Sequence, residues 1–184
     1  MTMKIYLASK SPRRRELLNQ IGIEFEVIDV EIDESWDGKE SPEDYVRRIA
    51  IEKARAGKML INNNLPVLAA DTAVVLEGHI LGKAENRDDA KAMLERLSGK
   101  THEVLSAITV IKEQEHSRVN ISQVTFKDLS KQEIDDYCNT DEPIGKAGGY
   151  AIQGKAAIFI EQLEGSYSGV MGLPLFETYQ LLNL

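Results

Sequence analysis

Short apolar runs alternate with helical patterns in the first third of the chain. Residues 4–8 are typical of a short buried strand, and the sequence FEVID at 25–29 predicts a second strand. Between them, a Ser-Pro start at residues 11 and 12 predicts a capped helix that runs to about residue 20. A second Ser-Pro start, followed by an acidic first turn, predicts a long helix over residues 41–61.

The rest of the chain continues this alternation. Residues 65–81 predict a strand, an interruption and a second strand, with residues 77–79 as a plausible turn. A helix over 86–100 follows, because Asn86 can cap it and Gly99 stands after its apolar stripe. The later predictions, in chain order, are strands at 102–112 and 118–129 joined by the polar residues 113–117, a helix at 130–138 with a capping box, a loop and two strands within 145–165, and a helix at 172–182.

The order of these elements predicts the class of fold. Strands and helices alternate over 184 residues without a repeat, a low-complexity segment or a linker, so we expect a single domain spanning residues 1–184. Such alternation is typical of an α/β fold. The two long strands between residues 102 and 129 form a hairpin-like pair, so the sheet is expected to be mixed and not wholly parallel.

The charge balance limits the classes of partner. The chain carries 22 Lys and Arg residues against 30 Asp and Glu residues, a formal charge of −8. This argues against general binding of nucleic acid, which requires many cations to neutralise phosphates. A local basic cluster in an acidic chain instead indicates a site for a small anion.

Cysteine and histidine usage argues against disulfide and zinc chemistry. Cys138 is the only cysteine, and the histidines at 79, 102 and 116 lack the spacing of common zinc sites. The first residues do not resemble a signal peptide, and no apolar run is long enough for a membrane span. We therefore expect a cytoplasmic protein that binds neither nucleic acid nor membrane.

Three consecutive arginines, Arg13, Arg14 and Arg15, stand where the first predicted strand is followed by the first helix. The first turn of a helix favours an anion, so arginines there oppose the helix dipole, and a bound phosphate would resolve this conflict. The cluster is too short for a nucleic-acid patch and has no interleaved aromatic residue. Neither common glycine-rich phosphate loop occurs in the chain, so a nucleotide site would be built from side chains and a helix start.

Three further charged residues occupy informative positions. Lys53 falls on the apolar stripe of the long helix, where it either faces an anionic partner or extends past the helix edge to solvent. Asp71 interrupts the apolar sequence VLAADTAVVL, and either ends a strand and caps a turn with Thr72 or acts as a general base or metal ligand. Lys83 follows a glycine in a loop and has little meaning alone.

Four blocks, LASKSPRRRELL, EKARAG, AADTAVVLEGHILGKAENRDDAKAMLERLSGKTHEV and GYAIQGKAAIFIEQLEGSYSGVMGLPLFET, closely resemble the Maf family of nucleoside triphosphate pyrophosphatases. The resemblance covers essentially the whole chain and is strongest to the branch that acts on dTTP and UTP. It implies a Maf/ITPase-like fold, in which helices flank a curved mixed sheet and a cleft separates two lobes. It also implies a nucleoside triphosphate substrate, attack of water on the α-phosphorus, and a divalent cation, Mg²⁺ or alternatively Mn²⁺.

The resemblance also implies roles for individual residues. The proton acceptor of the family matches Asp71, which is also expected near the metal, and the acidic metal-site residue matches Glu34, with Glu31 and Asp33 as alternatives. The specificity positions and the phosphate-binding positions form two further sets. They are, for specificity, Arg13, Thr72 and Gln153, and, for phosphate, Ser9, Arg14, Lys53 and Lys83.

The residues suggest why a pyrimidine would be selected. Uracil and thymine present acceptor, donor and acceptor along one edge, and the Gln153 amide offers a donor and an acceptor in one plane. The alternative is that Gln153 is only a strand residue. Two other functions stay open at this stage: the same chemistry on a methylated guanine nucleotide, and a nucleotide-binding regulator of septum formation without catalysis. The oligomeric state is also open, with a homodimer as the alternative to a monomer.

Overall fold

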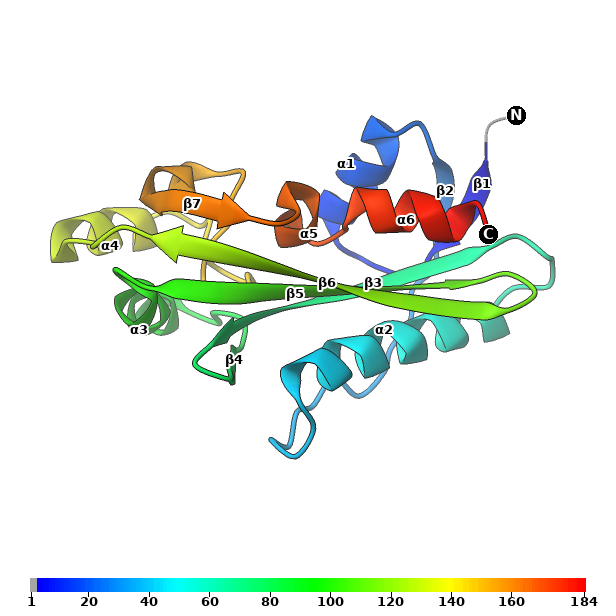
Figure 1. Cartoon of the computed structure of the whole chain (residues 1–184), viewed down its shortest axis with the longest axis horizontal. Helices are drawn as coiled ribbons and strands as arrows, with labels where there is room; N and C mark the ends of the chain where they lie inside the picture. Colours follow the sequence, from blue (N-terminus) through cyan, green and yellow to red (C-terminus); the bar gives the residue numbers. More distant parts are fainter. Residues whose placement is uncertain (1–2) are drawn as a thin grey trace.

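The computed structural model describes residues 3–184, and its core is one mixed sheet with helices packed on both faces (Figure 1). The strands are β1 (Lys4–Leu7), β2 (Glu24–Val27), β3 (Val67–Leu76), β4 (His79–Leu81), β5 (Thr101–Ile111), β6 (Glu115–Phe126) and β7 (Ile160–Glu164). The helices are α1 (Pro12–Gln20), α2 (Pro42–Met59), α3 (Arg87–Leu97), α4 (Lys131–Cys138), the 3₁₀ helix η1 (Lys155–Phe159), α5 (Tyr167–Met171) and α6 (Leu175–Leu182).

The strand order in the sheet is β2-β1-β3-β5-β6-β7, and β4 pairs with β3 beyond the end of β1. β1 runs parallel to β2 and β3, whereas β3, β5, β6 and β7 pair in antiparallel fashion. The predicted α/β class and the mixed sheet are therefore confirmed. Within residues 3–184, no helix is both long and apolar enough to cross a lipid bilayer.

The two faces of the sheet carry different helices (Figure 1). α2 lies along one face, where its residues Val46 and Ala50 pack against Ala73 and Leu105. The opposite face is covered by α1 and α6 towards β1, and by α3, α4 and η1 towards the other end of the long strands. β3 is buried on both faces, which explains its nearly continuous apolar sequence.

Helix starts follow the predicted chemistry with one exception. The side chains of Ser41, Asn86 and Ser130 each accept a hydrogen bond from the first turn of their helix, and Ser130 forms the predicted capping box. Ser11 occupies the N-cap position of α1, but its side chain makes no capping hydrogen bond. Its backbone N–H instead donates to Ser9 Oγ at 3.3 Å.

Three segments differ from the predicted pattern. β6 begins at Glu115, so most of the linker expected at 113–117 is strand. The first of the two strands expected within 145–165 is wrong, because residues 151–154 form a turn that leads into η1. The short helix α5 was not predicted at all, since five residues are too few to show a helical period.

Candidate functional site

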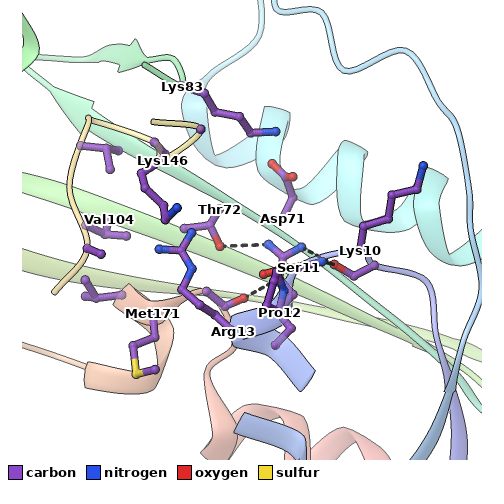
Figure 2. A pocket seen from close by; sticks show the side chains of 18 of the residues that line it. Lys10, Ser11, Pro12, Arg13, Asp71, Thr72, Lys83, Val104, Lys146 and Met171 are labelled. Atoms are coloured by element: carbon purple, nitrogen blue, oxygen red, sulfur yellow. Dashed lines mark hydrogen bonds between the residues drawn. The ribbon is translucent and has the colours of Figure 1, made fainter. Parts of the chain in front are cut away.

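One cavity of about 1040 Å³ lies between the β1–α1 loop and the segment 145–154 (Figure 2). It corresponds to the cleft expected between two lobes. The structure brings every predicted site residue to its wall: Ser9, Arg13, Arg14, Glu34, Lys53, Asp71, Thr72, Lys83 and Gln153. Residues from six separate segments of the chain therefore converge on one hollow, which is the usual geometry of a ligand site.

The cavity forms at a gap in the pairing of β3. β1 pairs with Val67 and Leu68 and then ends, and β4 pairs only from Val74 onward. In the described part of the chain, residues 69–73 of β3 therefore have a strand partner on one side only, which is β5. Side chains from both faces of β3 can reach the cavity through this open edge.

The side chains of Asp71 and Thr72 reach the cavity at this edge from opposite faces of β3. Consecutive residues of a strand point to opposite faces, so Asp71 lies on the α2 face and Thr72 on the other face. Both line the cavity all the same. Because Asp71 stands in the middle of β3, the alternative that it ends a strand and caps a turn is wrong.

The α2 face of the cavity holds a cluster of paired charges. Lys53 Nζ lies 2.9 Å from Asp71 Oδ1 and 2.9 Å from Glu34 Oε1. Lys53 therefore points inward to two anionic partners and does not extend to solvent. Lys83 Nζ lies 3.7 Å from Glu34 Oε2, and Figure 2 shows the Lys83 side chain reaching towards Asp71.

Glu34 is the acidic residue of its loop that shares Lys53 with Asp71. Burial raises the pKa of the Glu34 carboxyl, but the hydrogen bond and charge of Lys53, together with Lys83, outweigh this and lower it overall. Asp33 Oδ1 instead accepts the Ser35 N–H at 2.9 Å. Glu31 lines the cavity but forms no ion pair within the described residues.

Arg14 is buried and largely committed to the protein. Its Nε donates to the Gly172 carbonyl at 2.8 Å, its Nη1 to Ser9 Oγ at 3.0 Å and its Nη2 to Thr72 Oγ1 at 3.3 Å. Burial lowers its pKa, and the charge of Asp71 partly opposes this effect. Two of its five N–H groups remain for a ligand.

Arg13 and Lys146 lie side by side on the wall opposite Asp71 (Figure 2). Burial lowers the pKa of both side chains, and the charge of Arg13 lowers that of Lys146 further. Neither forms an ion pair within residues 3–184, so two cations face the cavity without a carboxylate partner. The sequence prediction missed Lys146, because a lysine in a glycine-rich loop has no periodic pattern that would single it out.

The loop that carries Lys146 is fixed against the loop that carries Lys83. Lys83 pairs with Ala147 and Ala84 with Ile144 as isolated bridges. The Gly145 N–H donates to the Ala84 carbonyl at 2.8 Å, and the Ala84 N–H donates to the Lys146 carbonyl at 3.2 Å. The two lysines thus come from one connected rim of the cavity.

The Thr72 side of the cavity is more apolar. Val74 and Val104 are register partners on β3 and β5, and they share this face with Thr72. Figure 2 shows Val104 to the left of Thr72 and Met171 below it, both away from Lys83. Further apolar groups complete this wall: Tyr150, Ala151, Ile152 and Val170.

Gln153 reaches the cavity from a turn. Its expected place in a strand is wrong, because residues 151–154 form no strand. Its role in base recognition stays a prediction. Glu142 fixes this turn from behind: its carboxylate accepts the Lys155 N–H at 3.0 Å and the Tyr137 hydroxyl at 3.0 Å. The Gln153 side chain is exposed, and its neighbours Ala151 and Ile152 are buried.

A divalent cation would find part of a coordination site here. The described residues contain no group of three or more His, Cys, Asp or Glu side chains suited to a metal. Two carboxylates, those of Asp71 and Glu34, nevertheless converge on one cationic atom, Lys53 Nζ. Magnesium is commonly held by one or two carboxylates together with substrate phosphates and water, so this donor set fits such an ion.

Comparisons with known proteins identify the family of the chain. A family model described as "Maf-like protein" matches residues 4–184. A dTTP/UTP pyrophosphatase of Alkalilimnicola ehrlichii is 53% identical, over 97% of this chain and 91% of the relative. A dTTP/UTP pyrophosphatase of Methylococcus capsulatus is 51% identical, over 98% of this chain and 90% of the relative.

The chain therefore belongs to the Maf family. Among solved structures, the Staphylococcus aureus Ham1 protein aligns with a TM-score of 0.52 over 98% of this chain and all of that chain. Its sequence identity is 13%, so this likeness supports the fold alone. The family and the fold predicted from the sequence are both confirmed.

Proposed function

We propose that this protein is a nucleoside triphosphate pyrophosphatase that hydrolyses dTTP and UTP to the nucleoside monophosphate and pyrophosphate. The observation that carries the proposal is one cavity in which Asp71 shares a charged wall with Lys53 and Lys83. The names of two relatives above 50% identity, both dTTP/UTP pyrophosphatases, support the reaction and the substrate.

The two unlike walls of the cavity match the two parts of such a substrate. The triphosphate, with close to four negative charges, would lie along the cations Lys83, Arg13 and Lys146. The pyrimidine would lie in the apolar part beside Val104 and Met171, close to Thr72 and Gln153. The ribose would lie between the two parts, and the α-phosphorus attached to it would face Asp71.

The catalytic step assigned to Asp71 is proton transfer. Its carboxylate would accept a proton from the water that attacks the α-phosphorus, and pyrophosphate would leave on the opposite side. Lys53 holds Asp71 Oδ1 in place at 2.9 Å, which leaves Oδ2 as the oxygen for the water. The basic wall would stabilise the charge on the leaving pyrophosphate.

Magnesium or manganese is the expected metal, and Glu34 with Asp71 would hold it together with phosphate oxygens. When bound, the ion would supply additional positive charge at the phosphates.

A single assay tests the reaction and its substrate. Purified protein and Mg²⁺ are incubated in oxygen-18 water with UTP, dTTP, CTP and a methylated guanine triphosphate, and the products are identified by mass spectrometry. The proposal expects pyrophosphate and a labelled monophosphate, with UTP and dTTP preferred. Label in pyrophosphate or release of orthophosphate would contradict attack of water on the α-phosphorus. Preference for the guanine nucleotide would contradict the pyrimidine substrate. Binding without turnover would favour a non-catalytic regulator.

A further inference from the structure

A buried hydrogen-bond chain starts at Ser106 on β5 and ends in the cavity. Ser106 is 0% exposed, and its register partner across the sheet is Thr72. Ser106 Oγ donates to the Gly169 carbonyl at 2.6 Å and lies 2.9 Å from Thr72 Oγ1. Thr72 Oγ1 in turn accepts from Arg14 Nη2 at 3.3 Å.

The donors and acceptors fix the direction of this chain. A serine hydroxyl has one proton, and the Gly169 carbonyl can only accept, so the Ser106 proton is used there. The Ser106 oxygen must then accept from Thr72, which commits the only hydroxyl proton of Thr72. One lone pair of Thr72 accepts from Arg14, and the second is left for the cavity.

We propose that Ser106 is a positioning residue for base selection, because it turns Thr72 into a hydrogen-bond acceptor that has no proton to donate into the cavity. The inference rests on the proposed function. Its ligand class is a nucleobase that presents an N–H between two carbonyl oxygens. Uracil and thymine carry a proton on N3, whereas cytosine carries a lone pair there and would meet the lone pair of Thr72.

The position of Thr72 supports this assignment. Thr72 lies on the apolar face of β3. The next residue on this face, Val74, pairs with Val104, and both valines line the cavity. The charged groups Asp71 and Lys53 lie on the opposite face. A hydroxyl on the apolar side is placed to contact the base. A polar group left unpaired there costs binding free energy, so a matched hydrogen bond discriminates strongly between bases.

Gly169 is adapted to this arrangement. A Cβ at this position would lie 2.8 Å from Asn120 Oδ1 and 3.1 Å from Ser166 Cβ. A side chain there would require Asn120 and Ser166 to move, so glycine favours the close approach of α5 to β5 and β6 that brings the Gly169 carbonyl to Ser106.

The test measures discrimination between UTP and CTP. Ser106→Ala frees the Thr72 proton to point into the cavity, so we expect the ratio of kcat/KM for UTP to that for CTP to fall roughly tenfold. Thr109→Val is the matched control, because Thr109 is 0% exposed on the same strand and does not line the cavity. This control should leave the ratio unchanged.

A double-mutant cycle separates positioning from general damage. In a Thr72→Val background, Ser106→Ala should no longer change the UTP-to-CTP ratio, since Ser106 acts through Thr72. An unchanged ratio in the single variant, or the same fall in both backgrounds, would overturn the inference. Ser106→Cys keeps a weak donor and should give an intermediate ratio, and it replaces Ser106→Ala if the alanine variant does not fold.

Dissociation constants for UTP and CTP, measured without added metal, test the role of Ser106 separately from the proposed pyrophosphatase activity. Absence of pyrophosphate release from the wild type would reject the proposed function. The ratio of the two dissociation constants would still test Ser106, with the same expected fall in Ser106→Ala and the same contradiction if the ratio is unchanged.

Discussion

Lys53 Nζ and Asp71 Oδ1 lie 2.9 Å apart, and both side chains are nearly buried at the wall of the cavity. A lysine on the apolar stripe of α2 and a carboxylate in the middle of an apolar strand each break the local pattern of their element. Each compensates the other, because a buried charge is tolerated when it is paired. Sequence features that look unfavourable one at a time thus form a single charged site.

The first prediction concerns the pH dependence of activity. Lys53 lowers the pKa of Glu34 by a hydrogen bond and by its charge, against the effect of burial. Lys53→Met should therefore raise the pKa of Glu34, so that the carboxylate is protonated at higher pH. We expect kcat/KM at neutral pH to fall about 10- to 100-fold and the acid limb of its pH profile to move to higher pH.

Lys91→Met is the control for this profile, since Lys91 pairs with Asp135 at the surface and outside the cavity. Its profile should match that of the wild type. An acid limb that stays in place in Lys53→Met would show that the ionisation of Glu34 does not limit the reaction.

Gln153→Glu should weaken the use of pyrimidine triphosphates. Glutamate offers acceptors only, so it cannot donate to a carbonyl of uracil or thymine. We expect kcat/KM for UTP and dTTP to fall about 10- to 100-fold, and the use of a methylated guanine triphosphate to rise relative to them. Gln123→Glu, on the exposed side of β6, is the matched control. Unchanged turnover of both pyrimidines would remove Gln153 from base recognition.

Lys146→Met should weaken binding of the phosphates. Lys146 faces the cavity beside Arg13 and has no carboxylate partner among the described residues, so an anion would relieve the repulsion between the two cations. We expect KM for UTP to rise about tenfold, with inhibition by pyrophosphate weakened to a similar degree. Lys131→Met, at the exposed start of α4, should change neither quantity. Wild-type values for KM and pyrophosphate inhibition in Lys146→Met would contradict the assignment.

His102 should make the fold sensitive to acid. Its ring is 2% exposed, and burial lowers its pKa to about 4 from an ordinary 6.5. Below pH 6.5 the unfolded chain binds a proton that the folded chain does not, so the free energy of unfolding falls as the pH falls from 6.5 towards 4. We expect His102 to account for a loss of about 2 kcal/mol between pH 7 and pH 5.

Urea unfolding at the two pH values measures this loss. His102→Gln should reduce the difference between them, whereas His79→Gln, at the exposed start of β4, should leave it unchanged. An identical difference in wild type and His102→Gln would show that the buried ring does not control the acid response. His102 also donates to or accepts from the Tyr150 hydroxyl at 2.7 Å, so the variant is compared by its pH dependence and not by its absolute stability.

The sequence predicts those parts of the fold in which local chemistry and long-range packing agree. The capping box at Ser130 and the long helix after Ser41 have strong local signals, and the structure contains both. The turn that contains Gln153 and the early start of β6 depend on partners elsewhere in the chain. β6 begins at Glu115 because Glu115 pairs with Ile111 of β5, which no local pattern of residues 113–117 reveals.

The site was predictable where a charged residue breaks an apolar pattern, as Lys53 and Asp71 do. Ser106 gives a weaker signal of the same kind, a hydroxyl in the apolar strand LSAITVI, and Lys146 gives none. Their importance appears only when β3, β5 and the loop after α4 are assembled around one cavity.

Asp71→Asn tests the central claim most directly. The substitution keeps the size of the side chain and a hydrogen bond to Lys53 but removes the base, so we expect a folded protein whose kcat with UTP and Mg²⁺ is lower by roughly 10²- to 10⁴-fold. The melting temperature should fall, because Lys53 loses one of its two compensating charges. Asp135→Asn, which removes a surface carboxylate paired with Lys91, should retain wild-type turnover. A kcat for Asp71→Asn within a few-fold of the wild type would contradict the account.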